Sequence, residues 1–232
     1  MNYVISDIHG MYTKYIEMMN LIDLQDTDTL YILGDIVDRG PQSMKILQDM
    51  MKRPNVFGIF GNHELMMIEC LSFLCQEITE EFLNSLDEEK LMRLSDWMNN
   101  GAFYTIKEFK SLSKKEQQDI IEYLMELTAY EEVTVNGKDY LLVHAGLGDF
   151  SEGKSLDEYD VNDFVWKRPD WDIPYFTDPN KFVVVGHTPT LGINGKPEIF
   201  YKNNFIAIDC GACFENGTLA CLCLDTMEEF YV

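Results

Sequence analysis

Several features are scarce in this chain of 232 residues, and each absence excludes a class of protein. There is no run of about 18 apolar residues, so no membrane-spanning helix is expected. Six cysteines are too few for a disulfide scaffold of this length. Lysine and arginine total 18 against 40 aspartates and glutamates, which gives a net charge of −22. A surface this acidic repels phosphate backbones and anionic lipids, so neither nucleic acid nor membrane is an expected partner.

No cleavable targeting segment is expected either, because the chain passes from Met1 directly into a predicted strand at 3–5. A cytoplasmic location is therefore expected. With 46% hydrophobic and 25% charged residues, the composition is typical of a globular protein. At about 150 residues per domain, we expect residues 1–232 to form one domain with an insertion. No long heptad repeat calls for a dimer, and a monomer is expected.

Residues 3–60 alternate between strand and helix patterns. Apolar segments at 3–5, 29–33 and 56–60 predict short buried strands, with helices near 13–21 and 41–51. This βαβαβ order predicts a parallel sheet with right-handed crossovers. A polar cluster follows each strand at once, at the position where α/β proteins bind their ligands.

The middle and the end of the chain follow different patterns. Residues from about 64 to 127 have helical periodicity, with matches to capping boxes at Ser85–Glu88 and Ser113–Glu116, and predict a helical insertion. Strands are predicted at 132–135 and 140–143 around the turn Asn136-Gly137, and at 182–185, 205–208 and 218–224. Parallel units followed by hairpins predict an α/β fold of two sheets packed face to face, with helices outside.

The chain has only four histidines, and each lies at or just beyond the end of a predicted strand. A lone histidine is more often a hydrogen-bonded core or surface residue than a ligand. Here none is left over for such a role, which favours a shared site. The four are His9, His63, His144 and His187.

Carboxylates, an amide and an arginine accompany these histidines. Asp7 precedes His9 by two residues, Asp35, Asp38 and Arg39 lie between glycines, and Asn62 precedes His63. Mixed aspartate, histidine and asparagine ligands suit manganese, iron, zinc or nickel. Each aspartate alone could instead cap the helix that follows it, but capping does not explain the accompanying histidines.

The cysteines form a separate cluster near the C-terminus. Cys210 and Cys213 form a C-x-x-C pair, while Cys221 and Cys223 alternate on a predicted strand. Four such thiols could bind zinc or pair as disulfides. Buried, reduced thiols in strands are the expectation for this composition.

Five short motifs in this order complete the pattern: SDIHG at 6–10, GDIVDRG at 34–40, GNHE at 61–64, HAG at 144–146 and GHT at 186–188. With them, the chain resembles the phosphoprotein phosphatase branch of the calcineurin-like metallophosphoesterases. Ser6 stands where the family usually has glycine, which spares the ligands. The likeness extends to 97–101, 166–168 and 208–211. In length the chain is similar to small bacterial and phage serine/threonine phosphatases and to the symmetrical diadenosine tetraphosphate hydrolases.

The resemblance implies a fold and a set of metal ligands. The fold would be a four-layer α/β/β/α sandwich of two mixed sheets with a helical insertion. Asp35 would bridge two divalent metals, of which manganese is expected first. The ligands implied are Asp7, His9 and Asp35 for one metal, and Asp35, Asn62, His144 and His187 for the other. A hydroxide activated by both metals would be the nucleophile.

The resemblance also implies roles beside the metals. His63 would protonate the leaving group, and Asp38 would orient it. Arg39 would bind phosphate oxygens, together with Asn62 and, as a second clamp, Arg168. An ordinary surface arginine is the alternative for Arg168, while Glu64 is expected to have a structural role.

Two substrates fit the same implied site. The first reading is a metal-dependent protein phosphatase acting on phosphoserine, phosphothreonine or phosphotyrosine, with a preference for basic or neutral flanking residues. The alternative is a symmetrical diadenosine tetraphosphate hydrolase. The acidic insertion favours the first, because a nucleotide enzyme should offer aromatic and basic groups there. A catalytically dead relative is a third reading, but the implied ligands, acid and arginine are all present.

Overall fold

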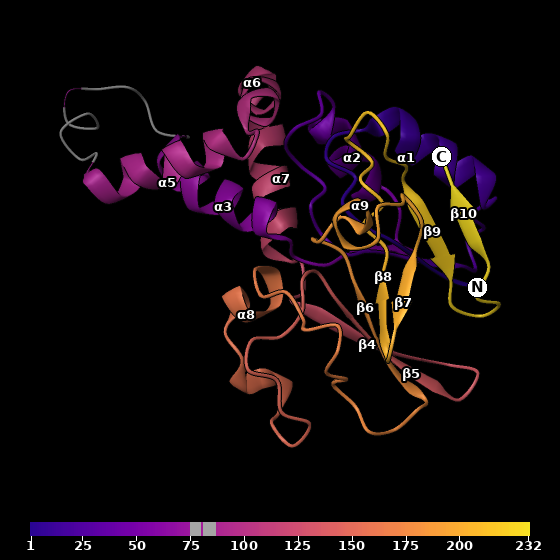
Figure 1. Ribbon diagram of the computed structural model, residues 1–232. Helices are drawn as coiled ribbons and strands as arrows, with labels where there is room; N and C mark the ends of the chain where they lie inside the picture. Colours follow the sequence, from indigo (N-terminus) through magenta and orange to yellow (C-terminus); the bar gives the residue numbers. More distant parts are fainter. Residues whose placement is uncertain (75–79, 81–86) are drawn as a thin grey trace.

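The computed structural model describes residues 1–74, 80 and 87–232, and two five-stranded sheets form its centre (Figure 1). The first sheet has the order β10 (Glu229–Tyr231), β9 (Ala220–Cys223), β1 (Asn2–Ile5), β2 (Thr29–Ile32) and β3 (Val56–Gly58). The second has the order β4 (Tyr130–Val135), β5 (Lys138–Val143), β6 (Lys181–Val185), β8 (Phe205–Ala207) and β7 (Phe200–Lys202).

Both sheets are mixed. β1, β2 and β3 run parallel, in the register Val4↔Tyr31 and Tyr31↔Phe57, while β9 joins β1 antiparallel. In the second sheet β5, β6 and β8 are parallel, and β4 and β7 are antiparallel edge strands. The two mixed sheets with helices outside confirm the predicted fold class.

Alternating side chains divide the core into layers. On β1, Val4 faces a core shared with the second sheet, while Ile5 faces the helices. On β6, Val184 faces that same inter-sheet core, and Val183 points to the opposite layer. The described residues therefore form an α/β/β/α order, with α1 (Tyr12–Leu21) and α2 (Ser43–Met50) outside the first sheet.

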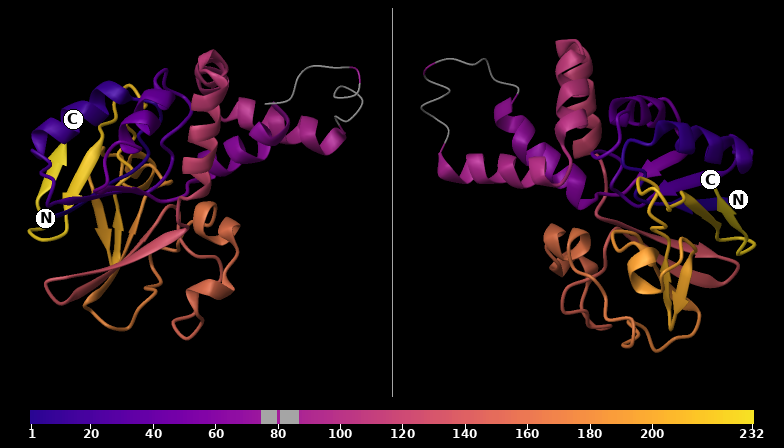
Figure 2. Two further views of the ribbon diagram at one scale, coloured as in Figure 1. Left: turned by 180° about the vertical axis from the view of Figure 1, so that it is seen from behind. Right: turned by 45° about the horizontal axis from the view of Figure 1, so that its top comes forward.

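The layer outside the second sheet is thin (Figure 2). It consists of η1 (Leu156–Glu158), α8 (Val161–Val165) and long loops, and α9 (Thr190–Ile193) follows β6. Loop aromatics supply much of its packing: Tyr175 stacks on Phe150 with ring centroids 4.2 Å apart, and packs edge-on against Phe205. Aromatic side chains thus replace helix surface over this sheet.

Most of the described residues between β3 and β4 are helical. Their helices include α3 (Asn62–Leu74), α5 (Glu88–Asn99), α6 (Phe103–Ser111) and α7 (Lys114–Met125). We propose, as the sequence predicts, that they form an insertion in one domain. The first of them begins at Asn62, two residues earlier than predicted, so two predicted site residues open a helix. In Figure 1 α3 and α5 extend sideways from the sheets.

The helix caps follow the sequence in part. Ser113 and Glu116 form the predicted capping box of α7. Ser85 lies outside the described residues, and α5 begins at Glu88 with Asp87 as its cap, whose side chain accepts a hydrogen bond from Lys90 N at 2.8 Å. Among the described helices, none is both long and apolar enough to span a membrane.

Candidate functional site

The predicted site residues meet where strands of both sheets end. Asp7 and Asp35 follow β1 and β2, Asn62 opens α3 after β3, and His144 and His187 follow β5 and β6. Hydrogen bonds tie the loops together: His9 N donates to Asp35 O at 2.8 Å, and His63 N donates to Asp35 Oδ1 at 3.1 Å. The carboxyl ends of the strands thus bring one cluster together from five parts of the chain.

The backbone of this cluster is locally disfavoured. Left-handed φ angles occur at Asp7 (51°), His9 (47°), Asp35 (51°), Asp38 (71°), Arg39 (64°) and His187 (60°). Non-glycine residues rarely adopt this region, and each costs about 1–3 kcal/mol. Space is equally restricted, because a Cβ at Gly61 would meet both the backbone nitrogen and a carboxylate oxygen of Asp35. The surrounding structure therefore has to hold these loops in place.

Asp35 occupies the centre of the cluster. Its Oδ2 lies 3.6 Å from His9 Nε2, and its Oδ1 lies 3.3 Å from His144 Nε2. Asp35 accordingly belongs to two candidate metal-binding groups, one with His9 and His63 and the other with His144 and His187. A carboxylate with one oxygen toward each group can bridge two cations.

The histidines are suited to bind a cation, because the ring nitrogens that carry lone pairs face the cluster. His144 Nδ1 lies 2.7 Å from Leu33 O and donates to it, and burial lowers the pKa of this imidazole well below its usual value. Its Nε2 therefore carries a lone pair toward Asn62 Oδ1, 3.0 Å away, and toward Asp35 Oδ1. Electron-rich atoms this close repel one another unless a cation lies among them.

His9 and His187 also each have a buried Nε2 without a hydrogen-bond partner. His9 Nδ1 donates to Val37 O at 2.9 Å, which leaves its buried Nε2 without a hydrogen-bond partner. Burial lowers the pKa of His9 well below its usual value, and that of His187 to about 3. Neutral imidazoles with unpartnered buried nitrogens are the state that a divalent metal requires.

Asp7 lies beside this cluster, next to Asp209, a carboxylate for which no role was predicted from the sequence. The Oδ2 atom of Asp7 accepts from His187 N at 3.0 Å and from the Ser6 hydroxyl. Buried Asp209 adjoins it, and burial raises the pKa of Asp209 to about 6. Burial and the Asp209 charge together raise the pKa of Asp7 well above its usual value. The segment 208–211 belonged to the resemblance, but Asp209 follows a strand with no histidine beside it, so no local signal marked it.

His63 is held by a buried carboxylate. Its Nδ1 lies 2.7 Å from Asp38 Oδ2, and the same oxygen accepts from Trp97 Nε1 at 2.7 Å. Asp38 N donates to Thr105 Oγ1 at 2.9 Å. This leaves His63 Nε2 facing the cluster. Trp97 lies in the segment 97–101 of the resemblance, but no role was predicted for it or for Thr105, because their part in the site depends on how the helices pack.

The two predicted arginines differ in their setting. Arg39 is exposed, with a guanidinium nitrogen 3.2 Å from His63 Nε2 and its Cζ 6.0 Å from the Phe214 ring centre. Arg168 is exposed and donates from Nε to Thr188 Oγ1 at 3.1 Å. Its charge contributes to the lowered pKa of His187, so Arg168 lies near the cluster.

Glu64 has the structural role expected for it. Its carboxylate is fully buried and accepts four backbone N–H groups, those of Asp35, Ile36, Val37 and Gly61, at 2.8–3.1 Å. One side chain thereby fastens the loop after β2 to the loop after β3. This bond pattern fixes the position of Asp35.

Within the part of the chain that the structure describes, the five cysteines are free thiols outside the cluster. Cys210, Cys221 and Cys223 are buried, and burial raises the pKa of Cys210 to about 12. The expectation of buried reduced thiols is confirmed for these three. Cys213 is half-buried and lies 3.9 Å from an Arg39 nitrogen.

The family model of the calcineurin-like phosphoesterases matches residues 3–208 of the chain that carries this site. The chain belongs to the calcineurin-like phosphoesterase family. Members of this family use divalent metals, and the Asp35 cluster can bind them. The family match and the relatives below make the protein a metallophosphatase, as the sequence predicted.

Three comparisons show what the chain is similar to. Symmetrical bis(5'-nucleosyl)-tetraphosphatase of Proteus mirabilis is 23% identical over 262 residues, covering 95% of this chain and 93% of that protein. Serine/threonine-protein phosphatase 2 of Salmonella typhimurium is 26% identical over 172 residues, covering 72% and 67%. The crystal structure of a candidate diadenosine tetraphosphatase shares the fold with a TM-score of 0.66 at 17% identity, over 100% of this chain and 92% of that one.

Proposed function

We propose that this phosphoesterase hydrolyses dinucleoside tetraphosphates between the central phosphates. The observation that carries the chemistry is the Asp35 carboxylate between two histidine groups, with arginines beside them. The choice of substrate is supported by the relative named a symmetrical tetraphosphatase, because it aligns over 95% of the chain. The protein-phosphatase reading, preferred from the sequence, has the weaker support, since its relative aligns over 72%.

We propose the ligand set that the sequence predicted for two divalent cations, with manganese as the first choice. The six ligands are Asp7, His9, Asp35, Asn62, His144 and His187. When bound, such cations supply an activated water and offset the charge of the phosphate. The chain's own part is to keep the imidazoles neutral and the carboxylates dry, which the burial of Asp35 and His144 favours.

His63 is assigned the proton transfer to the leaving oxygen. With Nδ1 held by Asp38, a protonated imidazole would direct its Nε2–H toward the cluster. Buried Asp38 fixes the orientation of the ring through this contact. Arg39 lies against this nitrogen, at 3.2 Å, and would move onto phosphate oxygens when substrate binds. Asn62 and Arg168 complete the phosphate contacts.

The cytoplasmic location and monomeric state stay predictions. Size-exclusion chromatography with light scattering checks the second, for which one chain of 26.9 kDa is expected. A mass of twice that value would contradict it.

The substrate proposal is tested by comparing kcat/KM for diadenosine tetraphosphate and for a phosphothreonine peptide on manganese-loaded protein. We expect the dinucleotide to be preferred by more than about tenfold, or about 1.4 kcal/mol of transition-state binding. ADP should be the sole product. AMP with ATP would contradict symmetrical cleavage, and a preferred peptide would restore the protein-phosphatase reading.

A further inference from the structure

A pocket of about 310 Å³ lies between α3, α5 and Trp166, the residue directly after α8. Met66 and Glu69 of α3 line it, opposite Arg93, Asp96 and Asn99 of α5 and the capping residue Asn100, and Trp166 lines a further side. Because α3 begins at Asn62, Met66 lies one turn along the helix from that proposed ligand, or about 6 Å. The pocket therefore starts one helical turn from the phosphate site.

Trp166 belongs to both places. Its ring stands edge-on to the His187 ring, with centroids 6.1 Å apart and planes at 88°. The same side chain lines the pocket and is 39% exposed. A large aromatic ring left partly uncovered beside a phosphate site offers a stacking surface for a second aromatic group.

The charges in the pocket exclude further phosphate. Glu69 and Asp96 contribute two carboxylates, while Arg93 lies 2.7 Å from Glu89 and 3.7 Å from Glu69. An anionic group would be repelled here. A neutral heterocycle with exocyclic amino groups would instead find carboxylate and amide oxygens as acceptors on Asp96, Asn99 and Asn100. The volume lies at the lower end of the range for small-ligand pockets, which suits one base and part of its ribose.

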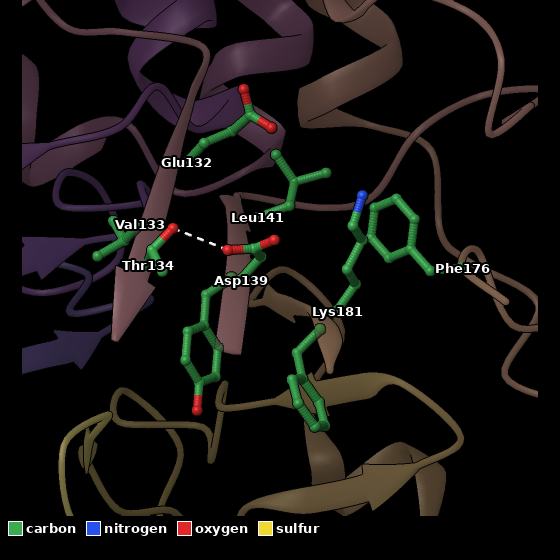
Figure 3. A pocket seen from close by; sticks show the side chains of 9 residues that line it. Glu132, Val133, Thr134, Asp139, Leu141, Phe176 and Lys181 are labelled. Atoms are coloured by element: carbon green, nitrogen blue, oxygen red, sulfur yellow. Dashed lines mark hydrogen bonds between the residues drawn. The ribbon is translucent and has the colours of Figure 1, made fainter. Parts of the chain in front are cut away.

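A second pocket of similar size shows why position matters (Figure 3). It has about 280 Å³ and is lined by strand residues including Asp139, Lys181 and Phe182, at the amino ends of β5 and β6. The site loops leave the opposite ends of those strands. A group tethered to a phosphate in the Asp35 cluster can reach the pocket beside Trp166 but not this one.

We propose that the pocket between α3 and α5 binds a nucleobase of the substrate, with Trp166 as its stacking partner. This rests on the proposed function, which it deepens by naming the subsite that distinguishes a nucleotide from a phosphopeptide. The aromatic group that a nucleotide enzyme should offer is thus not supplied by the insertion. It is Trp166, directly after α8.

Binding of the product tests the proposal without turnover. Calorimetry on manganese-loaded protein compares ADP with pyrophosphate, which has the same diphosphate and no base. We expect the intact protein to bind ADP at least tenfold more tightly. Trp166→Ala should weaken ADP binding at least fivefold and change pyrophosphate binding less than twofold, and Trp166→Phe should restore most of the loss.

A second variant leaves Trp166 and its neighbour His187 intact. Asn99 is exposed on α5, so Asn99→Trp should fold and fill the pocket, with the same selective loss of ADP binding. Phe57→Ala is the matched control, because Phe57 is an aromatic 47% exposed on β3 outside the pocket, and it should change neither affinity.

The outcomes separate this inference from the proposed function. Equal affinities for ADP and pyrophosphate, or equal losses of both in the variants, would overturn the base subsite even if the dinucleotide is hydrolysed. Selective ADP binding without dinucleotide hydrolysis would support the subsite and contradict the proposed reaction. If Asn99→Trp weakens a basic phosphopeptide and leaves ADP unchanged, the pocket binds a peptide side chain and the inference is wrong.

Discussion

In two regions of this molecule, side-chain oxygens accept hydrogen bonds from backbone N–H groups, in one region buried and in the other exposed. In the Asp35 cluster, the buried Glu64 carboxylate accepts backbone N–H groups from two loops. In α7, the exposed Ser113 and Glu116 side chains accept N–H groups of their own helix end. The first joins segments 28 residues apart, and the second joins residues three apart.

The contrast shows where local rules stop being sufficient. α7 has a local capping motif, helix-forming residues and a normal backbone, so its sequence specifies it nearly alone. The cluster combines left-handed φ angles with buried charge, both of which are unfavourable locally. Tertiary contacts have to stabilise it, together with the cations that we propose it binds.

Asp35→Asn should have the largest effect. Removing the charge shared by both histidine groups should reduce kcat/KM at least about a thousandfold, or about 4 kcal/mol, and reduce manganese retention. Steady-state kinetics and metal analysis measure both. Asp139→Asn, in the pocket of Figure 3, is the matched control and should be unaffected. Retention of normal activity by Asp35→Asn would remove Asp35 from the site.

His63→Asn should reduce the rate by about 10²–10⁴-fold for substrates with a poor leaving group. The loss should be smaller for an aryl phosphate, whose leaving group needs no proton, and manganese should stay bound. Asp38→Asn should act in the same direction. The same loss for both kinds of substrate would show that His63 does not transfer the proton.

Glu64→Gln should lower the free energy of unfolding by about 3 kcal/mol. Glutamine would replace an accepting oxygen by an NH2 group that faces backbone N–H donors. Urea denaturation of the metal-free protein measures the change. A loss below about 0.5 kcal/mol would mean that the loops around Asp35 hold their strained form without Glu64.

Manganese affinity should weaken at least tenfold from pH 7.5 to pH 5.5. Burial raises the pKa of Asp35 and Asp7 well above the usual value, and that of Asp209 to about 6, so these groups gain protons as the pH falls in this window. Protonated carboxylates bind metal poorly, so affinity rises with pH. The histidine pKa values are lowered and do not oppose this trend. Calorimetry at both pH values decides, and an unchanged Kd would contradict the sign.

Ser113→Ala should have the smallest effect, about 1 kcal/mol of unfolding free energy with unchanged activity. The cap is exposed and local, so its loss should not reach the Asp35 cluster. Thermal unfolding and kinetics on the same preparation measure both. A fall in kcat would show that α7 and the cluster are coupled.

The sequence was sufficient for residue types and layers but not for the geometry that tertiary packing creates. The order of strands and the histidines at their ends predicted two sheets and one shared edge. Strands β7 and β10 were not predicted, because each has only three residues and includes a charged one, whereas β3 lies in the apolar segment 56–60. Trp97 and Asp209 were missed as partners of Asp38 and Asp7, since long-range contacts leave no local periodicity. The left-handed angles are likewise unreadable from aspartate and histidine alone.

The number of manganese ions bound per chain at pH 7.5, counted by equilibrium dialysis, tests the metal site most directly. Two are expected, because Asp35 directs one carboxylate oxygen toward each histidine group. Fewer than one is expected in Asp35→Asn. A chain that binds no manganese, or an Asp35→Asn protein that still binds two, would contradict the claim that this strained edge is built around cations.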